Sequence, residues 1–399
     1  MPFYHLSRYV LKIPVDGGTI YYNTTNDCAV KLSESETIDD LDVQDFFVRN
    51  DFFIDDETVI NRYIESWMYP SEFNITISIT ESCNLSCPYC YQKDWNLNSV
   101  ITTEVLDAVI KYIHHKIEST THYKKIKVSF IGGEPLLAID KIHYFLEHIN
   151  SPLPITYVID TNGTLLTPAF VEMFESLTLN ITLSEKEDHD RYRPFKNGDG
   201  TYDIIVANIL RCKHLLNNRR NILFRYNVNR HNVADFELFL KTVKRINVTN
   251  NIDIERTYSL TDPNDVTYLS IDEYDIWHTH ALELLLKHGF PINPITIGYG
   301  SCSAYKANSF KVMSDGRLLL CNASLPSENV PNILDSFINY NKYYVDYKSR
   351  PPIDDDCRRC QYLLLCGGKL FCRDTNPCRF YDGNIYESLR LYLNHKKTQ

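Results

Sequence analysis

The sequence predicts an α/β protein built around a parallel sheet, with a small α+β region before the sheet and a loop-rich region after it. Residues 73–290 predict the sheet, because strand-like apolar runs alternate there with amphipathic segments long enough to be crossover helices. Residues 1–72 contain short strand-like runs followed by two helix-like segments. Residues 291–399 lack the alternation and hold seven of the twelve cysteines, which predicts a domain organised by metal.

Composition excludes several classes of function. At 399 residues the chain is long enough for two or three domains. The net charge of −10 argues against binding a phosphate backbone, so we expect no nucleic-acid partner, although a basic peptide would be compatible. There is no run of 18 apolar residues and no basic-then-apolar N-terminus, so we expect no membrane partner and a cytoplasmic location. In a reducing compartment, clustered cysteines indicate metal ligands rather than disulfides.

The first region, residues 1–72, predicts a small sheet followed by helices. A turn at Asp16-Gly17-Gly18 separates two strand-like runs, and a third run follows. The strand-like runs are 9–13, 19–23 and 28–32, and the helix-like segments are 39–49 and 57–68. This order resembles the winged-helix-like peptide-recognition domain of many peptide-modifying enzymes. The alternative is a structural cap on the next domain.

The middle region, residues 73–290, contains six strand–helix units, which predict a parallel sheet with helices outside it. In parallel barrels the chemistry lies at the carboxyl ends of the strands. The strand-like runs are 75–79, 126–131, 155–159, 179–183, 222–228 and 252–258, and the helix-like segments are 103–117, 138–149, 168–177, 202–217, 233–245 and 271–288.

A cysteine loop directly follows the first of these strands. Cys83, Cys87 and Cys90 have the spacing C-x3-C-x2-C. Three thiolates on one loop can bind three irons of a [4Fe-4S] cluster and leave the fourth iron for a small molecule. Half of a zinc site or a disulfide pair are the alternatives. With Tyr89 before the third cysteine, the loop resembles that of the radical S-adenosylmethionine (radical SAM) enzymes. The resemblance implies a partial (β/α)6 barrel and reductive cleavage of SAM to a 5′-deoxyadenosyl radical.

The resemblance also implies SAM-binding residues at the next strand ends. Gly132, Gly133 and Glu134 match the motif that binds the SAM amino group, and the glycines permit close backbone approach. Asn162 lies in Asp160-Thr161-Asn162-Gly163-Thr164, at a strand end that contacts SAM in related enzymes, although Asn-Gly also favours a plain turn.

After the fourth strand, Ser184 and Arg193 match residues that hold the SAM carboxylate, for which the planar fork of arginine is suited. This sequence reads Leu183-Ser184-Glu185-Lys186 where the family usually has Ser-x-Asp-Gly. On the fifth strand, the alternating residues Arg225, Asn227 and Asn229 predict a polar face that lines the barrel or meets water at its open edge.

The C-terminal cysteines resemble the SPASM domain, a module that binds auxiliary clusters in radical SAM enzymes that modify peptides. The match is C-x13-G-x4-C, a gap, and then C-x2-C-x5-C-x5-C-x5-C. In the family, three residues rather than five separate the third and fourth cysteines of this second run, and the gap before the last cysteine is longer. By this resemblance, one [4Fe-4S] cluster is bound by Cys302, Cys321 and Cys372. The other is bound by Cys357, Cys360, Cys366 and Cys378. A swap of Cys372 and Cys378 and a pair of zinc sites are the alternatives.

The sequence therefore predicts a radical SAM peptide maturase with three [4Fe-4S] clusters and SAM as cofactors. Its expected partners are a ribosomally made precursor peptide and a reducing protein such as flavodoxin or ferredoxin. The expected product is a thioether, a carbon–carbon crosslink or a similar change. The alternatives are an anaerobic sulfatase-maturating enzyme that forms formylglycine, and a non-catalytic iron–sulfur or zinc protein. Four carboxylates are candidate bases: Asp160, Glu185, Glu255 and Asp315.

Overall fold

The computed structural model of the 399-residue chain describes residues 5–92, 98–249, 251–257, 267–292, 309–319, 330–335, 353–366 and 384–396. These residues belong to two compact units. The first contains the described residues up to Tyr69 together with those from 353 onward. The second contains Pro70–Pro291 and the described residues between 309 and 335, apart from Ile292, which belongs to the first. Among the described residues no helix is long and apolar enough to cross a membrane.

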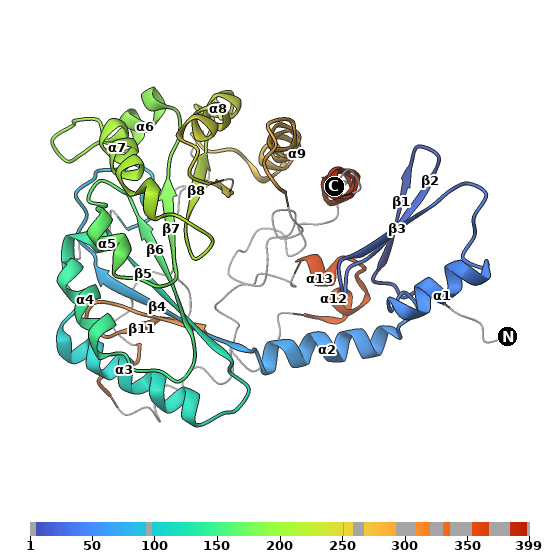
Figure 1. The fold of residues 1–399 in the computed structure, drawn as a ribbon, viewed down its shortest axis with the longest axis horizontal. Helices are drawn as coiled ribbons and strands as arrows, with labels where there is room; N and C mark the ends of the chain where they lie inside the picture. Colours follow the sequence, from blue (N-terminus) through green and yellow to red (C-terminus); the bar gives the residue numbers. More distant parts are fainter. Residues whose placement is uncertain are drawn as a thin grey trace. The chain divides into compact units, whose positions relative to one another are not determined.

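The first unit begins with a three-stranded antiparallel sheet in the order β1-β2-β3, followed by two helices (Figure 1). The hairpin turns at Gly18, where φ is +147° and an added Cβ would lie 2.0 Å from the Leu32 carbonyl oxygen, so no larger residue fits. The bounds are β1 Val10–Val15, β2 Gly18–Asn23, β3 Cys28–Leu32, α1 Leu41–Arg49 and α2 Asp56–Met68. The predicted strands and helices of the N-terminal region are confirmed.

Segments near the C-terminus complete this unit. They form α12 (Asp355–Arg359), α13 (Leu363–Cys366) and α14 (Asn384–Lys396). Buried Leu363 of α13 packs with Tyr9, Val59 and Ile60 in one hydrophobic cluster. Helix α14 is joined to the sheet by Asp27, which accepts hydrogen bonds from Tyr392 (3.0 Å) and Lys396 (2.8 Å). The first unit is thus assembled from both ends of the chain, and the three-domain division at 72 and 290 stays a prediction.

The second unit is built on an eight-stranded sheet in the order β11-β10-β4-β5-β6-β7-β8-β9 (Figure 1). Strands β4 to β9 are all parallel, and the inter-strand helices follow the predicted alternation. The strands are β4 Glu72–Thr80, β5 Lys125–Gly132, β6 Ile155–Thr161, β7 Leu177–Thr182, β8 Arg220–Val228 and β9 Ile252–Arg256. The helices are α3 Thr103–Glu118, α4 Ile139–His148, α5 Pro168–Glu172, α6 Lys186–Tyr192, α7 Tyr202–Cys212, α8 Phe236–Ile246 and α9 Ile271–Lys287. Two short 3-10 turns, η1 Pro135–Ala138 and η2 Lys213–Leu215, complete the described elements of these crossovers.

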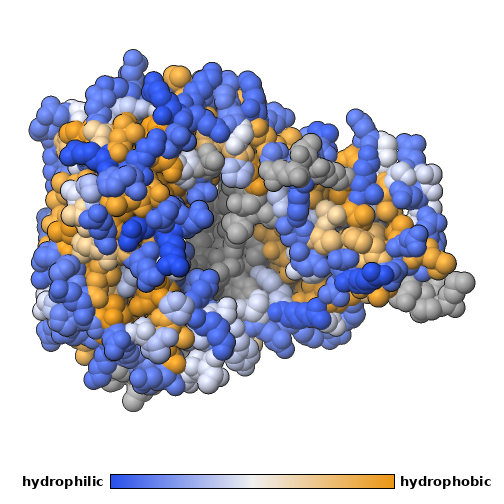
Figure 2. Space-filling model, viewed as in Figure 1, coloured by the Kyte–Doolittle hydropathy of each residue, from blue (hydrophilic) through white to orange (hydrophobic). Residues whose placement is uncertain are grey.

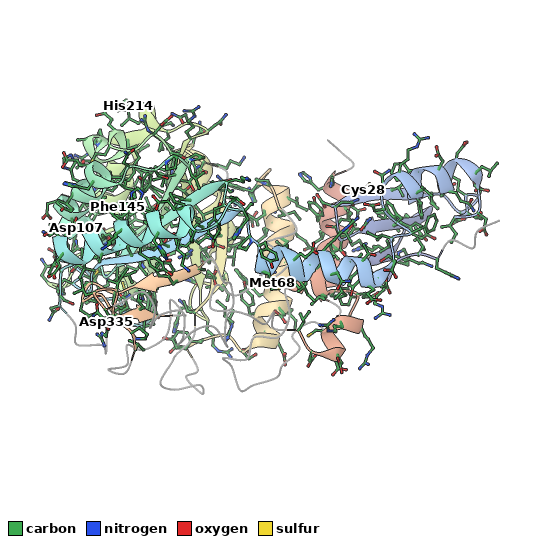
Figure 3. All side chains as sticks on the ribbon, turned by 90° about the horizontal axis from the view of Figure 1, so that it is seen from below. Cys28, Met68, Asp107, Phe145, His214 and Asp335 are labelled. Carbon is green, nitrogen blue, oxygen red and sulfur yellow. The ribbon has the colours of Figure 1, made fainter. Side chains whose placement is uncertain are left out.

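Apolar residues between the helices and the sheet form the core of this unit. Phe145 of α4 is fully buried and meets Phe130 of β5 edge to face at 5.4 Å (Figure 3). Helices α3 and α4 are joined by the Tyr144 hydroxyl, which donates to Asp107 at 2.8 Å. On the visible surface, hydrophilic and hydrophobic residues are interspersed (Figure 2).

Two features of the second unit were not predicted. Strand β10 (Ser309–Val312) pairs in parallel with β4 and, with β11 (Leu318–Leu319), extends the sheet, whereas the sequence predicted only a loop-rich domain after residue 290. Strand β10 has four residues, Ser-Phe-Lys-Val, and its buried Lys311 breaks the apolar run by which the other parallel strands were predicted. The second feature is α6, a two-turn helix in a segment for which the sequence predicted no helix.

Candidate active site

The cysteine loop leaves β4 and is joined to the segment that follows α6. Leu85, which is 5% exposed, forms a bridge with Phe195, and the Ser86 amide donates to the Pro194 carbonyl at 3.0 Å. The Cys90 amide donates to the Cys87 carbonyl at 3.1 Å, which closes a turn between the second and third cysteines. These contacts fix the loop at the carboxyl end of the parallel sheet, as the sequence predicted.

Burial dominates the chemistry of the first cysteine. Cys83 and Cys87 carry free thiols, and burial raises the pKa of Cys83 to about 11, with the charges of Glu134, Cys87 and Cys90 acting in the same direction. The Leu85 amide donates to the Cys83 sulfur at 3.4 Å and opposes this shift. The described residues contain no three ligands close enough for a single metal ion. A cluster differs from a single ion because each cysteine binds its own iron.

Gly132 and Gly133 allow the end of β5 to lie against the start of the cysteine loop. Gly132 has φ +149°, and a Cβ there would lie 2.0 Å from the Thr80 carbonyl oxygen. A Cβ on Gly133 would lie 2.4 Å from the Ser82 carbonyl oxygen. The Gly133 and Glu134 amides donate to those two carbonyls at 2.8 and 2.9 Å. The glycines therefore serve close backbone pairing between two strand ends.

Glu134 is fully buried, and its carboxylate is occupied by the protein itself. One oxygen accepts from the Leu136 amide at 3.0 Å and the Thr161 hydroxyl at 2.8 Å, and the other accepts from the Asn162 amide at 2.7 Å. Burial raises the pKa of this carboxyl, and the three hydrogen bonds oppose that shift.

Asn162 connects the end of β6 to the cysteine loop. Its side-chain oxygen accepts from the Thr164 amide at 2.9 Å, which fixes the amide orientation because a backbone N–H can only donate. Its side-chain nitrogen donates to Asn84 at 2.8 Å and lies 3.9 Å from the Cys83 sulfur. Asn162 is 5% exposed, so in this structure it contacts the loop rather than an open pocket.

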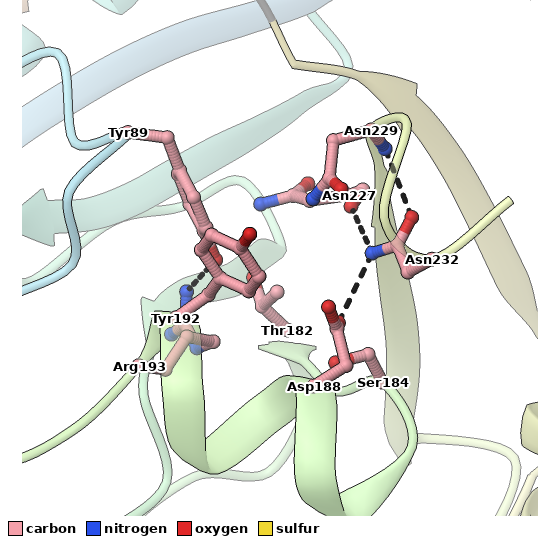
Figure 4. A pocket seen from close by; sticks show the side chains of 9 residues that line it. All are labelled: Tyr89, Thr182, Ser184, Asp188, Tyr192, Arg193, Asn227, Asn229 and Asn232. Carbon is pink, nitrogen blue, oxygen red and sulfur yellow. Dashed lines mark hydrogen bonds between the residues drawn. The ribbon is translucent and has the colours of Figure 1, made fainter. Parts of the chain in front are cut away.

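A small pocket that is partly open to solvent lies beside the cysteine loop (Figure 4). Tyr89, Ser184 and Arg193, all predicted site residues, line it, and so do Asn227 and Asn229 from the polar end of β8. Four lining residues were not predicted: Thr182, Asp188, Tyr192 and Asn232. Gly132, Gly133, Glu134 and Asn162 are not among the residues that line it.

Arg193 is the cation of this pocket. Its Nη1 donates to the Tyr89 hydroxyl at 3.0 Å, whereas its buried Nε has no hydrogen-bond partner (Figure 4). Burial would lower its pKa, but the nearby Tyr89 and Cys87 raise it, so the guanidinium stays charged. A buried donor on a charged group is costly unless a ligand accepts from it. Arg193 can therefore bind an anionic group such as a carboxylate.

Helix α6 and the loop after β8 form one wall of the pocket. The Asn232 side-chain nitrogen donates to Asp188 at 3.1 Å and to the Asn227 carbonyl at 3.1 Å (Figure 4). Tyr192 stacks on His231 with ring centroids 5.6 Å apart. Asp188 and Tyr192 lie one helical turn apart on α6, and the sequence analysis missed this relation because it predicted no helix there.

His189 lies behind this wall, fully buried, and its Nδ1 accepts from the Ser184 amide at 3.4 Å. Burial and then the charge of Arg193 hold its pKa well below the usual value, so the ring is neutral. Asp190 accepts from the amides of Thr201 and Tyr202 at 2.7 and 2.8 Å and so caps α7 from a distance. The Arg193 amide donates to the His189 carbonyl at 2.8 Å and the Thr201 hydroxyl donates to the Arg193 carbonyl at 2.7 Å, so these residues hold the Arg193 backbone and do not line the pocket.

The four candidate bases lie outside the pocket lining. Asp160 accepts from Asn180 at 2.6 Å, Glu185 accepts from Thr242 at 2.9 Å, and Asp315 pairs with Arg317 at 2.7 Å. Glu255, on β9, is exposed. Arg225 shares the half-buried face of β8 with Asn227, as predicted, but it pairs with Asp253 at 3.0 Å and does not line the pocket. Asp188 is the one carboxylate among the lining residues of this pocket.

Of the C-terminal cysteines, the structure describes the turn that bears Cys357 and Cys360 and the backbone of Cys366. The Cys360 amide donates to the Cys357 carbonyl at 3.1 Å, and the Cys357 amide donates to Asp354 at 2.8 Å. Cys357 packs against the cluster of Tyr9, Val59, Ile60 and Leu363 in the first unit. Cys302, Cys321, Cys372 and Cys378 lie outside the described residues.

Residues 77–243 match the family model of the radical SAM superfamily. The radical SAM cyclopropyl synthase TigE of Paramaledivibacter caminithermalis is 24% identical over 333 residues, which are 74% of this chain and 66% of that protein, slightly under two thirds. A cysteine-type anaerobic sulfatase-maturating enzyme of Clostridium novyi is 25% identical over 359 residues, 79% of this chain and 92% of that protein.

Two solved structures share the fold. anSMEcpe, with bound AdoMet and the Cp18Cys peptide, superposes with a TM-score of 0.62 at 17% identity and covers 82% of this chain and 98% of its own. Streptococcus suis SuiB, bound to the precursor peptide SuiA, has a TM-score of 0.57 at 14% identity and covers 95% of this chain and 99% of its own. SuiB aligns with a larger share of this chain than anSMEcpe does.

Proposed function

Since the chain carries a radical SAM domain and is a radical SAM enzyme, we propose that it modifies a ribosomally synthesised peptide, forming a thioether, a carbon–carbon crosslink or a similar product. The proposal rests on the antiparallel sheet of the first unit. Among the described residues this sheet has three strands, so β1 and β3 are edge strands. An edge strand can accept an extended peptide as an added strand. The family assignment removes the non-catalytic adaptor protein as an alternative.

The residues at the carboxyl end of the sheet fit a [4Fe-4S] cluster and SAM. Cys83, Cys87 and Cys90 supply three thiol ligands from one loop, and the unpartnered Nε of Arg193 suits a carboxylate. When bound, the cluster and SAM together supply a 5′-deoxyadenosyl radical for hydrogen abstraction.

The pocket residues provide position rather than the radical itself. Arg193 would hold the SAM carboxylate, and the Tyr89 hydroxyl, which accepts from Arg193 at 3.0 Å, fixes the guanidinium from the cysteine loop. Asp188 is the pocket group able to take up a proton, and Asn232 orients it.

We propose that the C-terminal cysteines bind two auxiliary clusters, with Cys302, Cys321 and Cys372 on one, and Cys357, Cys360, Cys366 and Cys378 on the other. The turn at Cys357 and Cys360 supports this, because two cysteines three positions apart lie on one supported turn. A flavodoxin or ferredoxin is the proposed electron donor.

The test combines the purified full-length chain, reconstituted without oxygen, with SAM, a reductant and peptides encoded by short reading frames beside its gene. A crosslink removes hydrogen from the peptide without forming an aldehyde, and 5′-deoxyadenosine should accumulate with it. Hydrogen exchange on the same mixture should show new protection of amides in β1 to β3 and none in β5 to β7. Deoxyadenosine without any peptide change, for every such peptide, would contradict the proposal.

The sulfatase-maturating alternative remains because the match to the Clostridium novyi enzyme spans 92% of that protein. Its product is formylglycine, an aldehyde that a hydrazide reagent captures. A sulfatase-derived cysteine peptide that becomes hydrazide-reactive would support this alternative, whereas a crosslinked but hydrazide-silent precursor peptide would exclude it.

A further inference from the structure

Glu134 occupies an unusual place, because it is bonded to two strand ends at once. Its backbone amide donates to the Ser82 carbonyl, one residue before Cys83, at 2.9 Å. Its carboxylate accepts from the Asn162 amide at 2.7 Å and the Thr161 hydroxyl at 2.8 Å, both at the end of β6. The carboxylate has no exposed surface and already accepts three hydrogen bonds from the protein, so a ligand would have to displace one of these donors or enter a buried site.

The bonded chain continues from Glu134 to the cysteine. The amide of Asn162 is held by Glu134, and its side chain belongs to a closed ring of hydrogen bonds. In that ring Asn162 donates to Asn84 (2.8 Å), Asn84 donates to the Thr164 hydroxyl (2.9 Å), and that hydroxyl donates back to Asn162 (2.6 Å). The same Asn162 nitrogen points at the Cys83 sulfur from 3.9 Å.

A second element supports this ring from outside. Asn208 of α7, 5% exposed, donates to the Gly163 carbonyl at 3.0 Å and to the Thr164 carbonyl at 2.8 Å. The ring is therefore fixed by β5 on one side and by α7 on the other. Buried and fully satisfied polar networks of this kind hold a single geometry.

We propose that Glu134 and Asn162 are positioning residues that fix the Cys83 thiolate and donate a hydrogen bond toward it, rather than direct ligands of SAM. A donor near a cluster sulfur stabilises the more negative, reduced state. The pair therefore raises the reduction potential of the cluster before SAM is bound. The proposal concerns residues of this chain and does not depend on which peptide is modified.

The first test needs no cluster. In the apo protein, Cys83 is alkylated with N-ethylmaleimide and followed by mass spectrometry, with Cys87 in the same peptide region as the internal reference. Asn162→Ala should slow alkylation of Cys83 about fivefold relative to Cys87, the factor that one lost hydrogen bond to the reacting thiolate corresponds to. Glu134→Gln should change the ratio as well, because it releases the Asn162 amide. Ser184→Ala, which alters the pocket lining but no bond of the ring, should leave the ratio unchanged.

The second test uses the reconstituted chain without SAM. The signal of this cluster in electron paramagnetic resonance is identified as the one that changes when SAM is added. Asn162→Ala should shift its midpoint to more negative potential, and Thr161→Val, which removes a single bond to Glu134, should give a smaller shift in the same direction.

The outcomes separate the two roles of Glu134. If Glu134→Gln and Asn162→Ala change only SAM affinity, with Cys83 alkylation and the SAM-free potential as in the parent chain, the positioning role is overturned and Glu134 is a SAM ligand. If Glu134→Gln does not fold, Asn162→Ala and Thr161→Val still decide. Both readouts precede any peptide chemistry, so a failure of the proposed function leaves this test intact.

Discussion

The chain holds its two described groups of cysteines in opposite ways. The loop of Cys83, Cys87 and Cys90 is fixed by neighbouring strand ends of the same sheet, through Glu134 and Asn162. The turn of Cys357 and Cys360 is fixed by a separate fold at the other end of the sequence, since the Tyr9 hydroxyl donates to the Arg358 carbonyl at 3.0 Å. Among the described residues, the first site is held by contacts within the second unit, whereas the Cys357 turn is held by the N-terminal sheet and α2 of the first unit.

The sharpest way to separate the two sites is to remove one barrel cysteine. Cys83→Ala, Cys87→Ala and Cys90→Ala should each abolish SAM cleavage, because three ligands leave no redundancy on a cluster with an open iron. Iron per chain should fall by about four, the content of one cubane cluster. Normal production of 5′-deoxyadenosine by any of the three variants would refute the assignment of this loop.

The reverse experiment removes the support of the other site. Tyr9→Ala deletes a fully buried ring from the cluster that contacts Cys357, at a cost of roughly 3–5 kcal/mol to that unit. We expect iron bound by the C-terminal cysteines to be lost while cleavage of SAM without peptide continues.

Tyr144→Ala is the matched control, because Tyr144 is a tyrosine with one hydrogen bond to Asp107 in the other unit. It should leave iron content unchanged. Unchanged iron in Tyr9→Ala as well would show that the Cys357 turn does not need the N-terminal fold.

A smaller effect is expected within the pocket. Arg193→Ala should weaken SAM binding about 10- to 100-fold, because a charge-assisted bidentate pair contributes roughly 1.5–3 kcal/mol. Iron content should not change, since the Arg193 side chain donates its hydrogen bond to the Tyr89 hydroxyl rather than to a thiol. Equilibrium dialysis with labelled SAM measures this, and an affinity equal to that of the parent chain would assign the carboxylate to another residue.

The smallest expected effect is a difference between the two units in how much stability each loses as the pH falls. His189 is buried and neutral with its pKa lowered, so the unfolded chain takes up a proton first as the pH falls below about 6.5, and barrel stability declines. In the first unit, hydrogen bonds from Lys396 and two tyrosines lower the pKa of Asp27 against the effect of burial, so its contribution is lost only below the ordinary range of an aspartate. Denaturant unfolding at pH 7 and pH 5 should therefore show a larger loss for the barrel. His189→Gln should reduce that loss, and equal pH dependence in variant and parent would exclude His189 as the cause.

Much of the barrel could be predicted from local pattern. Each of the six predicted strands is a strand in the structure, from β4 to β9, because a covered parallel strand is an apolar run bounded by turns. The site residues Tyr89, Ser184 and Arg193 do meet in one pocket, since the carboxyl ends of parallel strands share one edge of the sheet. Helix α6 was missed, and with it Asp188 and Tyr192, because seven mostly polar residues carry no apolar periodicity.

The sequence by itself determined the spacing of the cysteines, the order of the strand–helix units and the arginine that follows the fourth strand, because each is written in consecutive residues. Only the tertiary structure decided that the Glu134 carboxylate bonds to Asn162, 28 positions away, and that Tyr9 bonds to Arg358, 349 positions away. Such bonds depend on which segments the fold brings together, and neither partner carries a local signal for the other. For the same reason, β10 beside β4 and the C-terminal helices in the first unit became visible only in three dimensions.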